Sequence, residues 1–315
     1  KILIYGDYDV DGTTAVSLVY SFFAKLHEEI AYYIPDRYKE GYGISKAGGE
    51  YAIDNGFGLI IALDCGIKAI DHVDFAKKNN IDFIICDHHR PGNELPKASA
   101  VLDPKREDCD YPFKELCGCG IGFKLIQAYS STIGLSDSDL HVYLDLVAIA
   151  IAADMVPINN GNRILCYFGL KQINSNPRMG IVPFIKAAKK SKFNVSDLVF
   201  SIAPKINAAG RIHSGKKAVD LLISDSLQTA NEISEQINNY NLERRSIDKT
   251  ITEQALEMIA SNAELQNKNT TVLYSPNWHK GVIGIVASRL METYYRPTII
   301  LSKSGDVVSG SARSV

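Results

Sequence analysis

Three aspartates lie within the five residues 7–11, in the stretch GDYDVDG near the start of the chain. They are Asp7, Asp9 and Asp11, and they follow directly after the apolar run KILIY. Carboxylates this close repel one another, so either a bound cation or exposure to water has to explain them. Carboxylate oxygens are the ligands that Mg²⁺ and Mn²⁺ prefer. The spacing therefore indicates a metal site, with a helix cap or a solvated turn as the alternative for any single acid.

Similar residues follow three other apolar runs in the first third of the chain. Asp64 ends GLIIALD, Asp87 with His88 and His89 ends DFIICDHH, and Asp103 lies within ASAVLDP. Short apolar runs separated by helical stretches predict a parallel sheet that is covered on both faces. Ligands of such sheets bind outside the carboxyl ends of the strands. We therefore expect these side chains to converge with the first aspartates at one edge of the sheet.

This cluster predicts two-metal chemistry. An imidazole among carboxylates favours Mn²⁺ over Mg²⁺. We expect Asp9 and Asp11 to reach one cation each from an extended turn, with Gly12 letting the chain bend into the next helix. Asp64, on the neighbouring strand, is placed to bridge the two cations. Two cations about 3.5–4 Å apart form the arrangement used for in-line displacement at phosphorus.

The composition is that of an ordinary globular protein with room for about two domains. The chain has 315 residues, of which 46% are hydrophobic, and a net charge of -2, which argues against a uniformly basic, histone-like binder. Its six cysteines lie scattered in mostly apolar or glycine-rich company, as expected for reduced thiols of a cytoplasmic protein. The longest apolar stretch, LVAIAIAA, is too short to span a bilayer, so we expect no membrane partner.

The middle and the end of the chain predict further elements. The run 145–157 is apolar nearly all round and predicts a buried helix ending in Asp154, an acid that needs a partner there. Residues 226–262 contain neither Pro nor Gly and repeat apolar residues at helical spacing, which predicts one long helix or a broken pair. The segments after it predict strand, helix, strand and strand.

These elements predict an α/β chain with two domains. A parallel-sheet catalytic domain occupies 1–225, a connecting helix occupies 226–268, and a smaller α/β domain starts at 269–315. The chain begins on a strand without Met and stops shortly after the last predicted strand. We expect it to be a piece of a longer protein and its second domain to be truncated.

Six short motifs carry a resemblance to a known family. GDYDVDG, LDCG, CDHH and AIAADMVP resemble, in order and spacing, motifs I to IV of the DHH phosphoesterase superfamily. NAAGRI and GSARS resemble the later motifs of its RecJ family of single-strand-specific 5′→3′ exonucleases. The resemblance covers nearly the whole chain. It implies that 1–225 is a DHH catalytic domain and that 269–315 begins a DHH-associated substrate-binding domain.

The resemblance also implies roles for individual residues. The implied ligands of two divalent cations, Mn²⁺ before Mg²⁺, are Asp9, Asp11, Asp64, His88 and Asp154. Asp64 is the implied bridging ligand, and Asp7, Asp87 and His89 are implied to support the ligands or orient a phosphate oxygen within the catalytic set. Tyr5 stands where many small-molecule members of the superfamily carry a histidine, so the first cation has fewer protein ligands here.

Two groups of residues are candidates for holding a nucleic acid strand. In NAAGRIHSGK and SGSARS, guanidinium groups and glycine-flanked amides suit a phosphate, with a helix-start turn as the alternative for the first. In PDRYKEGYG, tyrosines alternate with cations, as in single-strand binders, although an ordinary loop has the same composition. By resemblance, the residues that hold the strand are Arg37, Asn207, Arg211, Ser311 and Arg313.

We therefore predict a metal-dependent exonuclease that removes nucleotides from the 5′ end of single-stranded DNA in recombination and repair. Single-strand-binding protein and a helicase are further expected partners. One alternative is a phosphodiesterase for oligoribonucleotides or cyclic dinucleotides, although such relatives end in a GGGH-like motif where this chain has GSARS. The other is a non-catalytic DHH scaffold that binds nucleic acid, although degeneration would have erased the acids that stand here.

Overall fold

All residues, 1–315, are described by the computed structural model, and they divide into two compact units, 1–238 and 239–315. The first unit is built on a five-stranded sheet in which every neighbouring pair of strands is parallel. Its strands are β1 (Ile2–Gly6), β2 (Ile30–Tyr33), β3 (Leu59–Leu63), β4 (Asp82–Cys86) and β5 (Ala100–Leu102). Their order in the sheet is β2-β1-β3-β4-β5, which confirms the predicted parallel-sheet α/β fold.

Strand β2 is an addition to the four strands predicted for this sheet. Its four residues are all half-buried, and it lies at the edge of the sheet beside β1. Two glutamates precede it in the sequence. An edge strand of this kind lacks the long apolar run by which fully buried parallel strands are recognised.

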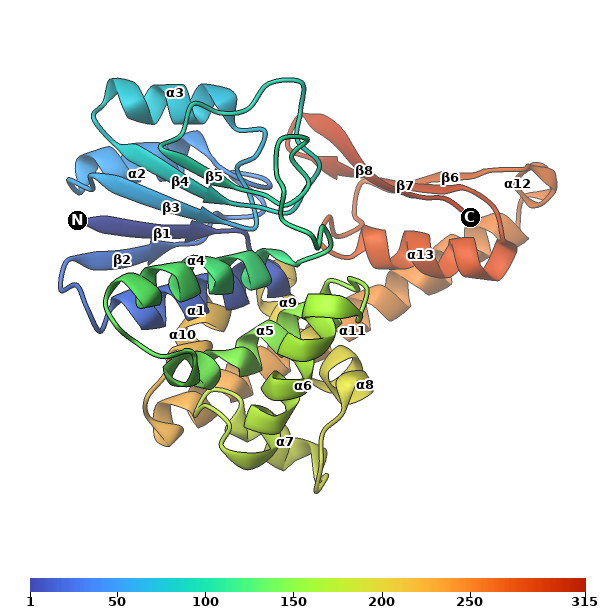
Figure 1. Ribbon diagram of the computed structural model, residues 1–315. Helices are drawn as coiled ribbons and strands as arrows, with labels where there is room; N and C mark the ends of the chain where they lie inside the picture. Colours follow the sequence, from blue (N-terminus) through green and yellow to red (C-terminus); the bar gives the residue numbers. More distant parts are fainter. The chain divides into compact units, whose positions relative to one another are not determined.

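Helices cover both faces of this sheet (Figure 1). One face carries α1 (Val10–Phe23) and α4 (Gly118–Thr132), and the other carries α2 (Lys46–Asp54) and α3 (Ile70–Lys78). Helix α5 (Leu144–Ala153) packs against α1 and α4 and is buried almost throughout, as predicted. Asp154 is its C-cap, so the helix ends at the acid that the sequence predicts as its end.

The rest of the first unit is helical and forms a layer beyond α5. It contains a 3₁₀ turn (Asp137–Tyr143), α6 (Asn160–Ser175), α7 (Val182–Ala188), α8 (Val195–Asp197), a π-helical turn (Leu198–Ile202), α9 (Ala203–Ile212) and α10 (Lys216–Leu222). Helix α6 packs along α5, and α10 and α9 both contact α1. The layer therefore holds two helices in place. These are α1, which carries Asp11 in its first turn, and α5, which ends at Asp154.

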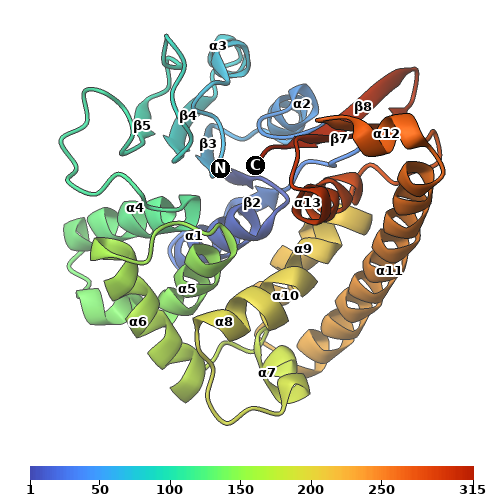
Figure 2. The same cartoon turned by 90° about the vertical axis from the view of Figure 1, so that its right-hand side faces the viewer.

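Helix α11 (Leu227–Ala260) is one unbroken helix (Figure 2), which decides between the two predicted forms of 226–262. The second unit continues with α12 (Ala263–Asn267), β6 (Thr271–Tyr274), α13 (Ile283–Tyr294), β7 (Thr298–Ser304) and β8 (Val307–Arg313). Its sheet has the order β6-β7-β8, parallel and then antiparallel, with α13 packed against it. The predicted strand, helix, strand and strand are confirmed, while the domain boundaries at 225 and 268 stay predictions.

No helix combines the length and the apolar character that a bilayer crossing requires.

Candidate active site

The register of the sheet aligns four aspartates at one edge. Gly6, Leu63, Cys86 and Leu102 pair in a single row across β1, β3, β4 and β5. The residues that follow them are Asp7, Asp64, Asp87 and Asp103. The strand order reverses direction between β1 and β3, and ligands of open α/β sheets bind at such a reversal. The sequence thus delivers its acids to the point where the fold itself favours a ligand.

Three carboxylates from separate segments surround the imidazole of His88. Its Nε2 lies 3.2 Å from Oδ1 of Asp64, 3.7 Å from Oδ2 of Asp11 and 3.7 Å from Oδ2 of Asp154. These residues come from the ends of β3 and α5 and from the first turn of α1. Donor atoms of Asp11, His88 and Asp154 lie within 4.8 Å of one another, and so do those of Asp64, His88 and His89. The predicted convergence of acids and histidine is therefore present in the fold.

Asp9 has a second task beside these residues. Its Oδ1 accepts a hydrogen bond of 3.0 Å from the amide of Gly12, and Asp9 is the N-cap of α1. The extended turn expected to run through Asp11 is therefore wrong, because the helix already begins at Val10. Asp11 is presented from a rigid helical turn instead, and one oxygen of Asp9 remains to meet a ligand.

Three carboxylates of this edge, those of Asp7, Asp11 and Asp64, carry strongly raised pKa values. Burial, and then the charge of Asp9, raises the pKa of Asp7 to about 8. Burial, and then Asp154, raises the pKa of Asp11 to about 8, while burial and Asp11 raise that of Asp64 well above its usual range. Neither oxygen of Asp7, nor Oδ1 of Asp64, makes a hydrogen bond of normal geometry.

A buried aspartate elsewhere in the same unit shows the contrast. Asp145 is fully buried, but Arg178 binds both of its oxygens at 2.8 Å. No guanidinium binds Asp7, Asp11 or Asp64 in this way, so the protein alone compensates their repulsion only in part. The unpartnered oxygens and the hard-oxygen donor set, with one or two imidazoles, fit divalent cations of the Mn²⁺ or Mg²⁺ type.

Asp87 organises the two histidines. Its Oδ1 accepts from the amides of His88 and His89 and lies 2.7 Å from Nδ1 of His89, and its Oδ2 accepts from the amide of Ile67. Burial alone would raise the pKa of Asp87, but the bonds from His89 and Ile67 outweigh it and lower the pKa. Burial, and then His89, lowers the pKa of His88 to about 4, which leaves a neutral imidazole suited to ligation.

Backbone close to the acids explains two glycines and identifies groups that the sequence prediction missed. The amides of Gly118 and Cys119, at the start of α4, donate to the two oxygens of Asp11 at 2.6 and 2.7 Å. A Cβ on Gly118 would lie 2.5 Å from Cβ of Asp64, and one on Gly12 would lie 2.5 Å from the carbonyl oxygen of Asp7. The glycine-rich start of α4, GCGIG, is the signal that a close approach was needed there.

The backbone of Asp64 is itself strained. Its φ is 58°, in the left-handed region that residues with a Cβ rarely adopt. Such strain is concentrated at functional sites, where it fixes a side chain in one direction. At Asp64 it turns the carboxylate toward His88 directly after β3 ends.

Tyr5 lies buried inside β1 and does not replace a ligand. Its hydroxyl donates to the carbonyl of Gly43 at 3.0 Å and accepts from the amide of Ser45 at 3.1 Å. The side chain therefore holds the loop that contains Tyr42. The hydroxyl of Tyr42 lies 3.2 Å from Nε2 of His89.

Three of the predicted strand-holding residues lie in the first unit near GDYDVDG. The guanidinium of Arg37 lies 4.8 Å from the centre of the Tyr8 ring. Asn207 and Arg211 lie one turn apart on α9, which approaches so closely that a Cβ on Gly210 would lie 2.2 Å from the carbonyl oxygen of Tyr8. The expectation that backbone amides of NAAGRI bind phosphate is wrong, because these residues are helical and their amides bond within α9.

The other two, Ser311 and Arg313, lie on β8 in the second unit, two residues apart and hence on the same face of the strand. Arg313 donates to Ser311 and to Ser288 of α13, both at 3.1 Å. A Cβ on Gly284 would lie 3.0 Å from Oγ of Ser311, so glycine keeps the start of α13 close to this strand. The group combines one cation with two hydroxyls, which suits a phosphate.

The sequence of this chain is similar to a known family and to several characterised proteins. The family described as "DHH family, N-terminal domain" matches residues 1–151. The single-stranded-DNA-specific exonuclease RecJ of Bacillus subtilis (strain 168) is 39% identical over 319 residues, covering 100% of this chain and 40% of that protein. The enzyme of the same description from Haemophilus influenzae is 34% identical, with 100% and 57% covered. The chain thus spans about half the length of these curated relatives.

A solved structure extends the similarity to the fold. The crystal structure of exonuclease RecJ bound to manganese is 30% identical to this chain, with a TM-score of 0.88, and the match covers 100% of this chain and 77% of that one. Similarity of this extent includes both compact units.

Proposed function

This chain belongs to the DHH family, and we propose that it is the catalytic part of a metal-dependent exonuclease that degrades single-stranded DNA from its 5′ end. The observation that carries the proposal is the convergence of Asp11, Asp64 and Asp154 on His88, within 3.7 Å and from separate segments of the fold. The similarity to single-stranded-DNA-specific exonucleases supports the choice of substrate.

Each group of the acidic edge has a proposed task. The residues that would hold two divalent cations, Mn²⁺ before Mg²⁺, are Asp9, Asp11, Asp64, His88 and Asp154. Bound cations would lower the pKa of a water and neutralise charge on the phosphoryl oxygens. His88, kept neutral by burial, offers the lone pair of Nε2. Asp87 fixes the ring of His89 through Nδ1, so that Nε2 faces the Tyr42 hydroxyl. Asp7 lines the same edge, and neither of its oxygens makes a hydrogen bond of normal geometry.

The strand itself would be held by side chains on both units. Arg37, Arg211 and Arg313 supply cations, and Asn207 and Ser311 supply neutral hydrogen-bonding groups. Arg211 on the first unit, and Ser311 and Arg313 on the second, are each proposed to contact the 5′ end of the strand, which would select that end. The cellular setting in this proposal is the cytoplasm, in recombination and repair, where single-strand-binding protein and a helicase would supply the substrate.

Digestion of one oligodeoxynucleotide, labelled at either end, tests the proposal. With Mn²⁺, the intact protein should release labelled mononucleotide at once from the 5′-labelled strand. The 3′-labelled strand should shorten one nucleotide at a time, and the matching duplex should resist. A dinucleotide hydrolysed much faster than the long strand would favour the oligonucleotide phosphodiesterase instead. Binding without any hydrolysis would favour the non-catalytic scaffold.

A further inference from the structure

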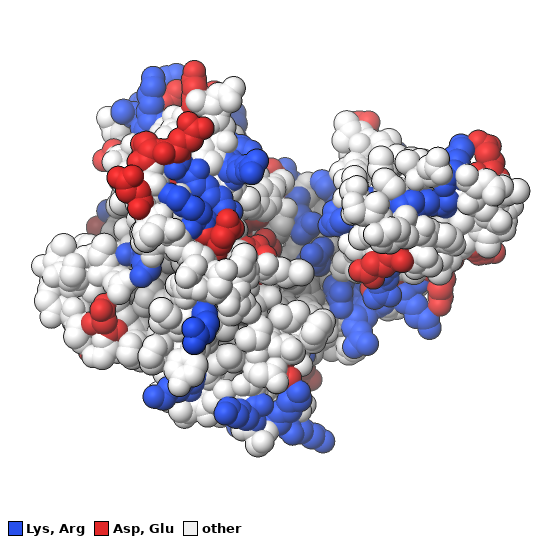
Figure 3. Space-filling model, turned by 45° about the vertical axis from the view of Figure 1, so that its right-hand side comes forward, with Lys and Arg blue, Asp and Glu red and all other residues white.

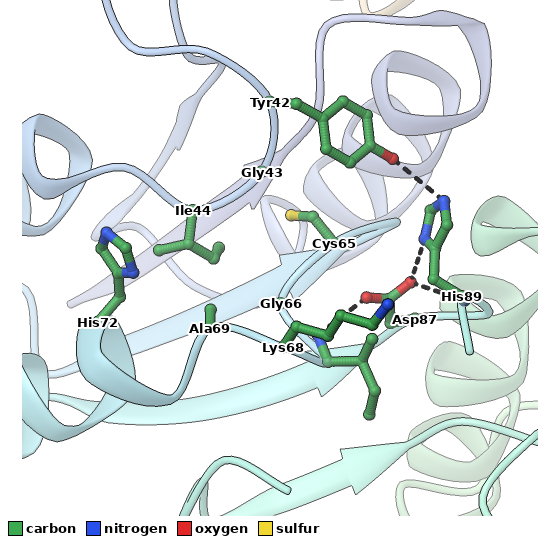
Figure 4. A pocket seen from close by; sticks show the side chains of 11 residues that line it. Tyr42, Gly43, Ile44, Cys65, Gly66, Lys68, Ala69, His72, Asp87 and His89 are labelled. Carbon is green, nitrogen blue, oxygen red and sulfur yellow. Dashed lines mark hydrogen bonds and ion pairs between the residues drawn. The ribbon is translucent and has the colours of Figure 1, made fainter. Parts of the chain in front are cut away.

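A pocket of about 410 Å³ opens beside the acidic edge, between the loop that carries Tyr42 and the turn after β3 (Figure 4). Its lining residues are Tyr42, Gly43, Ile44, Cys65, Gly66, Ile67, Lys68, Ala69, His72, Asp87 and His89. All of them belong to the first unit. The roles proposed above leave most of this space unused.

The pocket and the metal-type cluster share a wall. His89 belongs to the group of donors with Asp64 and His88, and its ring also lines the pocket. Asp87, which fixes that ring, lines the pocket as well. The Tyr42 ring stands edge-on to His89, with 6.0 Å between the ring centres. A group that fills the pocket therefore lies directly beside the place where a phosphodiester would be cleaved.

The chemistry of the walls suits a flat heterocycle. Ile44, Cys65, Ile67 and Ala69 supply apolar surface, and Cys65 and Ile67 are almost completely buried. Gly43 and Gly66, with φ values of 83° and 109°, add backbone to the lining. The polar groups stand apart from this surface, as the exposed Lys68 and the half-buried His72. An apolar slot with a few polar groups is typical of sites for planar ligands.

We propose that this pocket receives a nucleobase of the single strand, from a nucleotide adjacent to the phosphodiester that is cleaved. The inference rests on the proposed function and assigns a subsite to it. A base can enter such a slot only when it is unpaired and unstacked. The pocket therefore favours single strands over duplex at the step of substrate positioning.

Removing the base tests the subsite. Three 5′-phosphorylated oligodeoxynucleotides carry one abasic residue at the first, second or third nucleotide, and single-turnover cleavage of the first bond is measured with the intact protein and Mn²⁺. We expect the loss of one base that flanks this bond to slow cleavage about tenfold, the scale of one stacked base. The abasic residue that does not flank the bond should change little.

Filling the pocket gives the reciprocal test. Ala69→Leu adds bulk to its wall and should slow the unmodified strand about tenfold, while the sensitive abasic strand is cleaved at the same rate as by the unaltered protein. Ala187→Leu, the same substitution on the exposed side of α7, is the matched control and should change neither rate. The retained rate on the abasic strand also shows that the Ala69 variant is folded.

The outcomes separate the two proposals. Equal slowing of both strands by Ala69→Leu, or no effect of any abasic residue, overturns the subsite while hydrolysis by the unaltered protein upholds the exonuclease. Absence of cleavage by the unaltered protein overturns the exonuclease itself. If Ala69→Leu is inactive on every strand, Ile44→Ala, which removes wall atoms without adding bulk, takes its place and must slow only the unmodified strand.

Discussion

Asp64 destabilises the metal-free fold in two ways, through its backbone conformation and through its buried carboxylate. Its φ of 58° is strained, and its carboxylate is buried beside that of Asp11, with one oxygen that makes no hydrogen bond of normal geometry. Because burial and Asp11 raise its pKa, the fold disfavours the ionised form. In the metal-free chain this term is absent below the unfolded-state pKa and grows as the pH rises toward the folded-state pKa, so it destabilises the fold at neutral pH.

Asp64→Asn should therefore separate activity from stability. Asparagine tolerates the left-handed backbone, so the fold is kept. We expect hydrolysis to fall about a thousandfold or more, the scale for losing a major electrostatic group, while single-strand binding is retained. In EDTA at pH 7.5 the variant should melt at a higher temperature than the unaltered protein. Asp54→Asn, at an exposed position on α2, is the control. A lower melting temperature for the Asp64 variant would contradict the repulsion argued here.

Asp87 acts through the histidines and has a different signature. It accepts four hydrogen bonds, among them one from the amide of the proposed ligand His88 and one from Nδ1 of His89, so Asp87→Asn should loosen both histidines. We expect about 10- to 100-fold weaker Mn²⁺ binding by calorimetry, as for other groups that orient metal ligands. Raising the Mn²⁺ concentration should restore much of the lost activity. An unchanged titration would show that Asp87 does not position His88, the histidine proposed to hold a cation.

At the scale of elements, contacts between distant chain segments decide features of the site that no single segment of the sequence predicts. The acids could be predicted because each follows an apolar run, and strand ends in a parallel sheet share one edge. Helix α9 was less predictable, because the small residues of NAAGRI suggest a turn. In the structure, Gly210 lets α9 pack closely against the backbone of Tyr8. The contact of α4 with Asp64 through Gly118 likewise depends on tertiary packing, because the glycines of GCGIG signal a close approach but do not identify its partner.

Gly118→Ala tests that packing. The added methyl group would lie 2.5 Å from Cβ and 2.8 Å from Cα of Asp64, so α4 or the strained residue has to move. We expect a loss of about 1–3 kcal/mol in the free energy of unfolding, measured by urea denaturation, and a severe loss of activity. Gly161→Ala, in the first turn of α6, meets only ordinary contacts and should change neither. Full activity of the Gly118 variant would mean that the start of α4 does not position Asp64.

For the whole molecule, charge is the property that sequence predicted most directly. The net charge is -2, and lysines and arginines form several separate groups, not one continuous surface, on the face that Figure 3 shows. The parallel sheet and the long helix were also predictable, since both depend on apolar periodicity. The domain boundaries at 225 and 268 stay predictions, and the compact unit 1–238 takes in the first part of α11, which the periodicity reads as one element.

Scattered cations predict a weak dependence of binding on salt. If Arg37, Arg211 and Arg313 each neutralise one phosphate, log K against log salt should have a slope of about −2, at about −0.7 per contact on a single strand. Fluorescence anisotropy with a 5′-phosphorylated strand in Ca²⁺ measures this slope, provided that a separate assay shows no cleavage.

Arg313→Gln should reduce the slope by about 0.7. Arg106→Gln, at a residue paired with Asp108, should leave it unchanged. A slope steeper than about −5 would require many more phosphate contacts than these three residues provide, and the proposed strand-holding set would then be wrong.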